Sequence, residues 1–258
     1  MLHSTKGIVF HSLKYSETSI IVKIYTELFG LQSYLFKGIR NAKSKIKPGL
    51  FQSMTLLDLV VYHKEKQSLQ SVKEVHLAHP YKTIPFDIRK SSVTLFINEL
   101  VYKAIREEEA NPDLFGFLWQ ICLQLDETDE SVSFFHILFA LQLMHHLGIF
   151  PQDNHSSRFP VFNMREGLFQ ASVPGHPHYL DPANSLLFHN LIATCDGGGG
   201  RGHGRDVACN VSTSCNVSAG MSSEIRNQLL ETILVYYQLH LPGFRGVQSH
   251  HILHDVLA

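Results

Sequence analysis

The spacing of apolar residues separates a strand-rich N-terminal part of the chain from a helix-rich remainder. Five apolar runs with the alternation or clustering typical of strands occupy residues 7–13, 20–25, 31–37, 51–62 and 69–77. The four residues Glu27 to Gly30 supply a turn between the second and third runs. Five short strands in so few residues suit a small closed barrel, and the five-stranded OB-fold barrel is one such structure.

After residue 80 the apolar residues recur at steps of three and four, which is the spacing of helices that pack on one face. Asn111 and Asp181 each precede a proline, an arrangement that predicts a helix cap followed by the first helical residue. Ser91 or Ser92 is the corresponding candidate near the start of the first helix. The predicted helices cover residues 88–108, 112–125, 131–147, 182–192, 222–241 and 249–257.

These patterns predict an α+β protein in which an OB-fold barrel at residues 1–80 is followed by a mainly α-helical domain at residues 81–258. Two stretches interrupt the helices. Residues 152–180 contain three prolines and predict an irregular excursion with a short hairpin around Phe162 to Phe169. Residues 193–220 contain four consecutive glycines and many small polar residues, which predict a flexible loop.

The charge distribution adds a candidate function to this architecture. The formal net charge is only −1, but residues 1–82 carry 12 Lys and Arg against 5 Asp and Glu, and the remainder carries 10 against 18. Five of the cations fall within residues 37–47, which contain no acidic residue. A basic segment between two strands is typical of proteins that bind nucleic-acid phosphates, and the alternative is a solvated surface turn.

The candidate DNA-binding residues are the cations of this segment and one lysine of the second predicted strand. Lys23 shares a strand face with Tyr25, so that a cation and an aromatic ring are available for a phosphate and a base. Tyr15 and Tyr34 are further stacking candidates, each with an even chance of facing the barrel interior. The predicted DNA contacts are made by Lys23, Lys37, Arg40, Lys43, Lys45 and Lys47.

Other features of the sequence narrow the class of protein. The N-terminal residues lack the apolar core of a secretory signal, and polar residues interrupt the apolar tract Val132 to Phe150, which predicts a buried helix and no membrane span. Four scattered cysteines fit a reducing cytoplasm. The carboxylates of residues 107–109 and 126–130 are expected at helix ends or in loops as solvated charge, and no enzymatic site is predicted.

Short motifs in a fixed order resemble the RecO family of recombination mediators. In the strand-rich part these are TKGIVF at residues 5–10, TELFG at residues 26–30 and FKGIRNAKS at residues 36–44. LGIFP at residues 147–151 and YYQLHLP at residues 236–242 follow in the helix-rich part. The resemblance covers most of the chain, and the basic motif is its most specific member.

The resemblance implies a bacterial DNA repair protein of the cytoplasm, associated with the nucleoid. Such a protein binds single- and double-stranded DNA without sequence specificity, promotes annealing of complementary strands, and helps to load RecA together with RecR and the C-terminal tail of single-strand-binding protein. It performs no covalent chemistry and needs no cofactor. The cations of residues 37–47 fall on the basic loop of the family and are carried over as its DNA contacts.

One departure from the family concerns a metal. Many members carry a four-cysteine zinc site after the Leu-Gly-x-x-Pro motif, whereas this chain has no cysteine between Cys122 and Cys195. His176 and His178 have no thiolate or acidic neighbour in sequence, so we predict that packing replaces the metal. Two other functions stay open: a non-enzymatic adaptor that has lost DNA binding, and a histidine-dependent metal hydrolase, for which no ligand motif is present.

Overall fold

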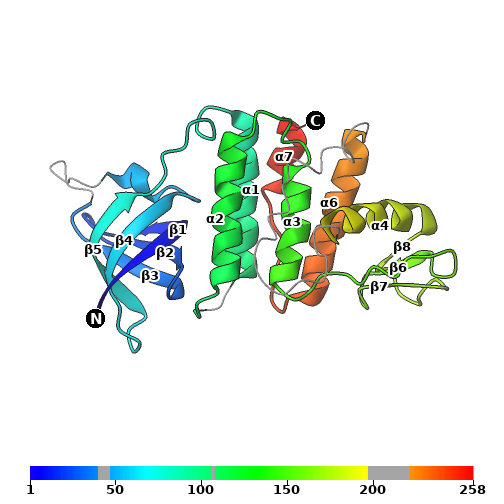
Figure 1. The fold of residues 1–258 in the computed structure, drawn as a ribbon, viewed down its shortest axis with the longest axis horizontal. Coiled ribbons are helices and arrows are strands. Elements are labelled where there is room, and N and C mark those ends of the chain that lie inside the picture. Colours follow the sequence, from blue (N-terminus) through cyan, green and yellow to red (C-terminus); the bar gives the residue numbers. More distant parts are fainter. Residues whose placement is uncertain (40–46, 106–107, 197–220, 258) are drawn as a thin grey trace. The chain divides into compact units, whose positions relative to one another are not determined.

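The computed structural model describes residues 1–39, 47–105, 108–196 and 221–257 (Figure 1). Contacts group the chain into two compact units, Met1–Glu127 and Thr128–Ala258. The first unit contains β1 (Leu2–Lys14), β2 (Ile20–Thr26), β3 (Gly30–Phe36), the 3₁₀ helix η1 (Pro48–Phe51), β4 (Leu56–Tyr62), β5 (Leu69–Leu77), α1 (Ile88–Ala104) and α2 (Pro112–Glu127). The second contains α3 (Phe135–His146), β6 (Val161–Asn163), β7 (Leu168–Gln170), β8 (Tyr179–Leu180), α4 (Pro182–Asp196), α6 (Ser223–His240) and α7 (His250–Val256).

The first five strands form a closed barrel in the order β1-β2-β3-β5-β4 (Figure 1). β1 pairs antiparallel with both β2 and β4, which its length of 13 residues allows. β3 and β5 complete the ring through a short parallel pairing of residues 33–35 with residues 69–71. The predicted α+β class, with an N-terminal five-stranded barrel followed by helices, is confirmed.

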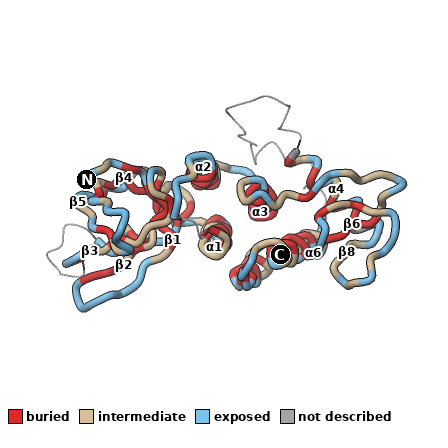
Figure 2. Tube along the Cα trace, turned by 90° about the horizontal axis from the view of Figure 1, so that it is seen from below, coloured by how far each residue is buried: buried red, intermediate tan, exposed pale blue. Residues whose placement is uncertain are grey.

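The barrel is filled by apolar side chains and is not a channel. Val22 and Ile24 on β2 are fully buried, as is Leu57 on β4, whereas Lys23 between the two β2 residues is partly exposed. Figure 2 shows this alternation as buried segments interrupted by more exposed ones. Because each fully buried large apolar side chain contributes about 1.5–3 kcal/mol, this alternation fixes which face of each strand points inwards.

Helices α1 and α2 belong to the same compact unit as the barrel, and aromatic residues join α2 to β1 and β2. The Tyr25 ring lies between Phe10, at a centroid distance of 5.5 Å, and Phe115 of α2, at 6.2 Å. The Lys6 ammonium lies 5.0 Å from the centroid of the Trp119 ring. The predicted domain boundary at residue 80 lies between the last barrel strand and the first helix. Whether it separates two domains stays a prediction.

The second unit has an α-helical core and a small three-stranded sheet. All α3 residues from Phe135 to Met144 are buried, which confirms the buried helix predicted in this tract. β6 pairs with β7 and places Phe162 opposite Phe169, as expected for the predicted hairpin. Phe162 also packs against Phe188 of α4, at 4.8 Å between ring centroids. Within the described ranges, no helix combines the length and apolar character needed to cross a membrane.

The fourth strand begins later than the predicted residue 51. Pro48 begins η1, and Phe51 ends it with its ring 4.4 Å from that of Phe36. Met54 has a positive φ of 63°, so that the backbone is not extended there. Pairing of β4 starts only at Leu56, and the predicted start of this strand is therefore wrong.

Two helix caps are confirmed and one is corrected. The side chains of Asn111 and Asp181 accept hydrogen bonds from backbone N–H groups of the first turns of α2 and α4. The cap of α1 is Asp87, which accepts from the backbone N–H of Arg89. Ser92 is already inside the helix and donates to the carbonyl of Ile88, so the predicted cap at Ser91 or Ser92 is wrong.

The remaining differences concern helix ends. α1 ends at Ala104 and not at residue 108, because Ile105 is extended, with φ −91° and ψ 117°. α3 begins at Phe135, four residues after the predicted start. α4 continues to Asp196, so residues 193–196 of the predicted Gly-rich loop are helical, and residues 197–220 lie outside the described residues.

Candidate nucleic-acid interface

The basic segment, residues 37–47, connects β3 to η1 and has an exposed lysine at each end, Lys37 and Lys47. Ile39 is only 2% exposed and belongs to the apolar core of the barrel, as does Phe51 at the end of η1. The described ends of the segment are thus anchored in the core, which holds both lysines at the barrel surface. The other predicted DNA contacts, Arg40, Lys43 and Lys45, lie outside the described residues.

Lys23 has a different environment from Lys37 and Lys47. It lies on β2, opposite His11 of β1 and Ser33 of β3. Its ammonium group is 5.3 Å from the centroid of the Tyr102 ring on α1, and the His11 ring stacks on the same tyrosine at 5.2 Å. A cation over an aromatic face is attracted by the ring quadrupole, so the charge of Lys23 already has a partner within the protein.

Two of the three candidate stacking tyrosines are buried. Tyr25 is 1% exposed between Phe10 and Phe115, and Tyr34 is fully buried in the barrel core. Burial raises the pKa of Tyr34 to about 12. The stacking role suggested for Tyr25 and Tyr34 is therefore wrong, because neither presents a ring face to a ligand. Tyr15, in the turn after β1, is 60% exposed.

Further cations lie in a turn that the sequence reasoning did not single out. OB-fold barrels bind oligonucleotides on β2 and β3 with help from the β1–β2 and β4–β5 turns. Lys64 and Lys66 are exposed in the β4–β5 turn. The buried Gln70 side chain orders this turn, because it accepts from the N–H of Lys64 and donates to the carbonyls of Lys64 and Gln67. Two lysines between two predicted strands were a signal available in the sequence.

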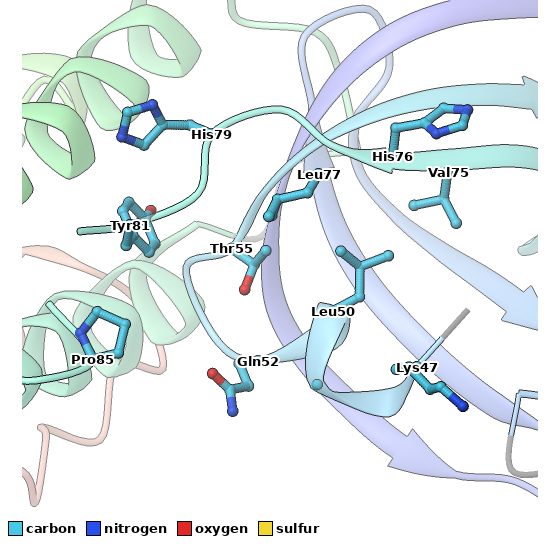
Figure 3. A pocket seen from close by; sticks show the side chains of 11 residues that line it. Lys47, Leu50, Gln52, Thr55, Val75, His76, Leu77, His79, Tyr81 and Pro85 are labelled. Atoms are coloured by element: carbon cyan, nitrogen blue, oxygen red, sulfur yellow. The ribbon is translucent and has the colours of Figure 1, made fainter. Parts of the chain in front are cut away.

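A pocket of about 500 Å³ lies directly beside Lys47 (Figure 3). η1 and the following loop form one side, the end of β5 forms another, and the linker from β5 to α1 forms the third. In Figure 3, Lys47 and His76 are on one side of the pocket and Tyr81 and Pro85 on the opposite side, with Leu77 between them. The pocket had no signal in the sequence, because it brings residues 47–55 against residues 75–85, and at least 20 positions separate these segments.

The linker that forms one pocket wall is held by Asp126 of α2. The Asp126 carboxylate accepts hydrogen bonds from the backbone N–H groups of Lys82, Thr83 and Ile84. Burial alone raises the pKa of this carboxyl, but these hydrogen bonds outweigh it and hold the pKa at about 2. Asp126 is 1% exposed, so the expectation that it is solvated charge is wrong.

Tyr81 and Lys90 extend the same network. The Tyr81 hydroxyl donates to the carbonyl of Met54, in the loop between η1 and β4, at 2.6 Å. The Lys90 ammonium donates to the carbonyl of Asp126 and to the Thr83 hydroxyl. The pocket wall is therefore tied to both the barrel and α2, which favours a rigid pocket.

The histidines of the second unit do not form a metal site within the described residues, where no group of three or more His, Cys, Asp or Glu side chains is arranged to hold an ion. His178 donates its backbone N–H to Nδ1 of His176. The Nδ1 atom of His189 lies 2.7 Å from Asp153, and its ring stacks on His155. These contacts are typical of packed surface histidines, and they offer nothing that favours the hydrolase hypothesis.

Comparison with known proteins agrees with this fold. A family model described as the recombination protein O N terminal matches residues 1–81, and one described as the recombination protein O C terminal matches residues 85–159. DNA repair protein RecO of Phocaeicola vulgatus is 32% identical over 258 residues, which is 100% of each chain. DNA repair protein RecO of Flavobacterium psychrophilum is 34% identical over 256 residues, covering 98% of each chain.

Proposed function

Because this chain belongs to the RecO family of DNA repair proteins, we propose that its barrel binds DNA strands through their phosphates and promotes the pairing of complementary strands. The observation that carries the proposal is the anchored basic segment. Its two described ends, Lys37 and Lys47, are exposed on a closed barrel, and the segment holds five cations and no acidic residue. Lys23 stays a candidate contact with a smaller expected contribution, since it is already paired with Tyr102.

Binding by these cations depends on charge and not on base sequence. DNA releases condensed counterions when lysines replace them at the phosphates, and the gain in free energy is lost as the salt concentration rises. Indifference to sequence suits a repair protein, because breaks occur at any position. Neutralised phosphates also repel a second strand less, which favours the approach of the complementary strand.

The proposal extends to partners that the resemblance implies. We expect the protein to act with RecR and with the C-terminal tail of single-strand-binding protein, and through them to load RecA in the bacterial cytoplasm at the nucleoid. The protein moves strands and partners and breaks no covalent bond. The measurement is RecA filament formation on DNA coated with single-strand-binding protein. Filaments should form faster when this protein and RecR are both present, and equal rates with and without this protein would contradict its loading role.

The DNA-binding proposal is tested by fluorescence anisotropy with a labelled oligonucleotide across a salt series. We compare the parent with a variant that carries Lys43→Glu, Lys45→Glu and Lys47→Glu. The variant should bind much more weakly at low salt. The slope of log affinity against log salt should fall by about 2, because each phosphate contact to a single strand contributes about 0.7.

A matched control has the same change in net charge elsewhere. Arg158, Arg165 and Arg245 are exposed residues of the second unit, and their replacement by Glu should leave the affinity and slope close to those of the parent. Equal affinities of the parent and the triple lysine variant would refute the proposal. No measurable affinity of the parent for DNA would favour the adaptor hypothesis, in which only protein partners bind.

A further inference from the structure

We propose that the pocket beside Lys47 holds one unpaired nucleobase of a DNA strand whose phosphates are bound by the basic segment. This inference rests on the proposed function and adds a base-dependent contact to a charge-dependent one. Lys47 is both the last residue of the basic segment and part of the pocket lining. A strand with a phosphate bound at Lys47 therefore passes beside the pocket.

The size and lining of the pocket fit a nucleobase. Its volume of about 500 Å³ is within the range of small-molecule sites, which are mostly apolar with a few polar groups. Leu50, Leu77 and Tyr81 supply apolar surface for the flat faces of a base, and Gln52 and Thr55 supply hydrogen-bonding groups for its edge. Figure 3 shows these side chains around a common space.

The charge of the lining favours a ligand attached to phosphates. The lining side chains that can carry positive charge are Lys47, His76 and His79, and there is no Asp or Glu among the described lining residues. The Asp126 carboxylate, 3.6 Å from Nε2 of His79, is 1% exposed and already accepts hydrogen bonds from the linker. The pocket entrance thus carries positive charge, as a polyanion requires.

Hydrogen bonds within the protein fix the walls of the pocket, which limits the loss of entropy on binding. Tyr81 is fixed by its hydrogen bond to the Met54 carbonyl, and the linker after it is fixed by Asp126. Gly49, a lining residue on the η1 side, is exposed, and a Cβ atom added to it would meet nothing within 4 Å. A preformed site of this kind binds more tightly than one that must first be ordered.

An occupied pocket distinguishes single strands from duplexes. A base in a duplex is stacked and paired, and it enters a pocket only after unstacking at a cost of a few kcal/mol. The phosphates of both forms remain available to the lysines. The protein is therefore expected to hold a single strand more tightly than a duplex, and pairing with the complementary strand withdraws the base and weakens the hold.

The test separates the base from the phosphates. Anisotropy is measured with an oligothymidylate and with an oligonucleotide of the same length whose sugars carry no bases. The parent should bind the abasic strand about tenfold more weakly, with the same salt slope, since stacking of one base has an effect of this order. This comparison uses no variant and is independent of folding defects.

Gly49→Phe locates the base contact. Gly49 is a lining residue at which an added Cβ meets nothing within 4 Å, so a phenyl ring fits there without a clash and is expected to narrow the pocket. The charge is unchanged, and the variant should bind both oligonucleotides with the weaker affinity. Gly116→Phe is the matched control, because Gly116 is an exposed residue of α2 whose added Cβ also meets nothing within 4 Å. It should keep the tenfold difference.

Each outcome decides between the proposals. Equal affinity of the parent for the two oligonucleotides, or an unchanged tenfold difference in Gly49→Phe, overturns the base pocket while salt-dependent binding keeps the proposed function intact. Absence of salt-dependent binding to either oligonucleotide overturns the proposed function itself. A labelled peptide rich in Asp and Phe provides the alternative ligand. If Gly49→Phe lost affinity for this peptide and kept the parent's affinity for DNA, the pocket would be assigned to a peptide and the base proposal would be overturned.

Discussion

Lys23 and Lys47 are lysines on the same barrel with opposite surroundings. Lys23, in the middle of β2, has its ammonium group over the Tyr102 ring of α1. Lys47 is exposed at the start of η1 and borders an open pocket. The difference teaches that a position on a barrel strand does not by itself leave a lysine available to a ligand, because Tyr102 of α1 lies against Lys23.

Asp126 connects the two regions. It lies on α2, whose aromatic residues pack on β1 and β2, and its carboxylate holds the linker that forms one wall of the pocket. The helix that packs on β1 and β2 therefore also fixes the linker that forms a wall of the pocket.

The largest effect is expected from Asp126→Ala. Three backbone N–H groups lose a shared charged acceptor, so the free energy of unfolding of the first unit should fall by about 3 kcal/mol. The measurement is urea unfolding followed by circular dichroism. Asp87→Ala is the control, because this cap serves a more exposed site and should lower the same free energy by only about 1 kcal/mol. Equal decreases in the free energy of unfolding in Asp126→Ala and Asp87→Ala would contradict the role of Asp126 in holding the linker.

A pH titration sharpens the same point. The folded-state pKa of Asp126 is about 2, below the value of about 3.9 in an unfolded chain. A depressed pKa stabilises the fold above pH 4, and this contribution, roughly 2.5 kcal/mol, is lost as the pH falls from 4 towards 2. Asp126→Asn cannot titrate, so its stability relative to the parent should improve over that range. A constant difference from pH 5 to pH 2 would contradict the assignment.

The exposure of Lys37 and Lys47 predicts that their replacement lowers the affinity for DNA. Lys37→Glu combined with Lys47→Glu should weaken single-strand binding at least tenfold at low salt and reduce the salt slope by about 1.4. Arg158→Glu with Arg165→Glu provides the same change in charge on exposed residues of the second unit. Equal DNA affinities of the double lysine variant and the double arginine variant would contradict a role of Lys37 and Lys47 in DNA binding.

The smallest effect is expected from Lys23→Gln. Loss of the cation over Tyr102 should lower the free energy of unfolding by about 0.5–1 kcal/mol, and DNA affinity should change by less than about twofold. Lys47→Gln should have the reverse profile, with a larger loss of affinity and unchanged stability. Thermal unfolding and anisotropy on the same samples measure the stability and the DNA affinity of each variant. A larger loss of affinity in Lys23→Gln than in Lys47→Gln would contradict the expected order of the two lysines.

The fold was largely predictable because most elements have a local signal. Strand alternation in β2 and the caps at Asn111 and Asp181 depend on residues that are close in sequence, and they appear where predicted. The start of β4 was not predictable from apolar content. Phe51 is buried at the end of η1, and a residue in a strand at the same place could be buried to the same extent. Burial alone does not distinguish a short 3₁₀ helix from a strand.

The site was less predictable than the fold because it depends on contacts between distant residues. The basic segment was visible as a run of charge. The covering of Lys23 by Tyr102 and the burial of Tyr25 under Phe115 depend on where the helices pack, which no local pattern specifies. The pocket joins Lys47 to Tyr81 across 34 positions, and Asp126 reaches the linker from 43 residues farther along.

The closed ring of strands also limits how copies of the protein can associate with one another. Each barrel strand has hydrogen-bonded neighbours on both sides, and the parallel pairing of β3 with β5 completes the ring. An open sheet would present an unpaired edge, and adjacent copies at high local density could join edge to edge and aggregate. The closed barrel has no such edge, so its five strands offer no site for edge-to-edge aggregation of copies.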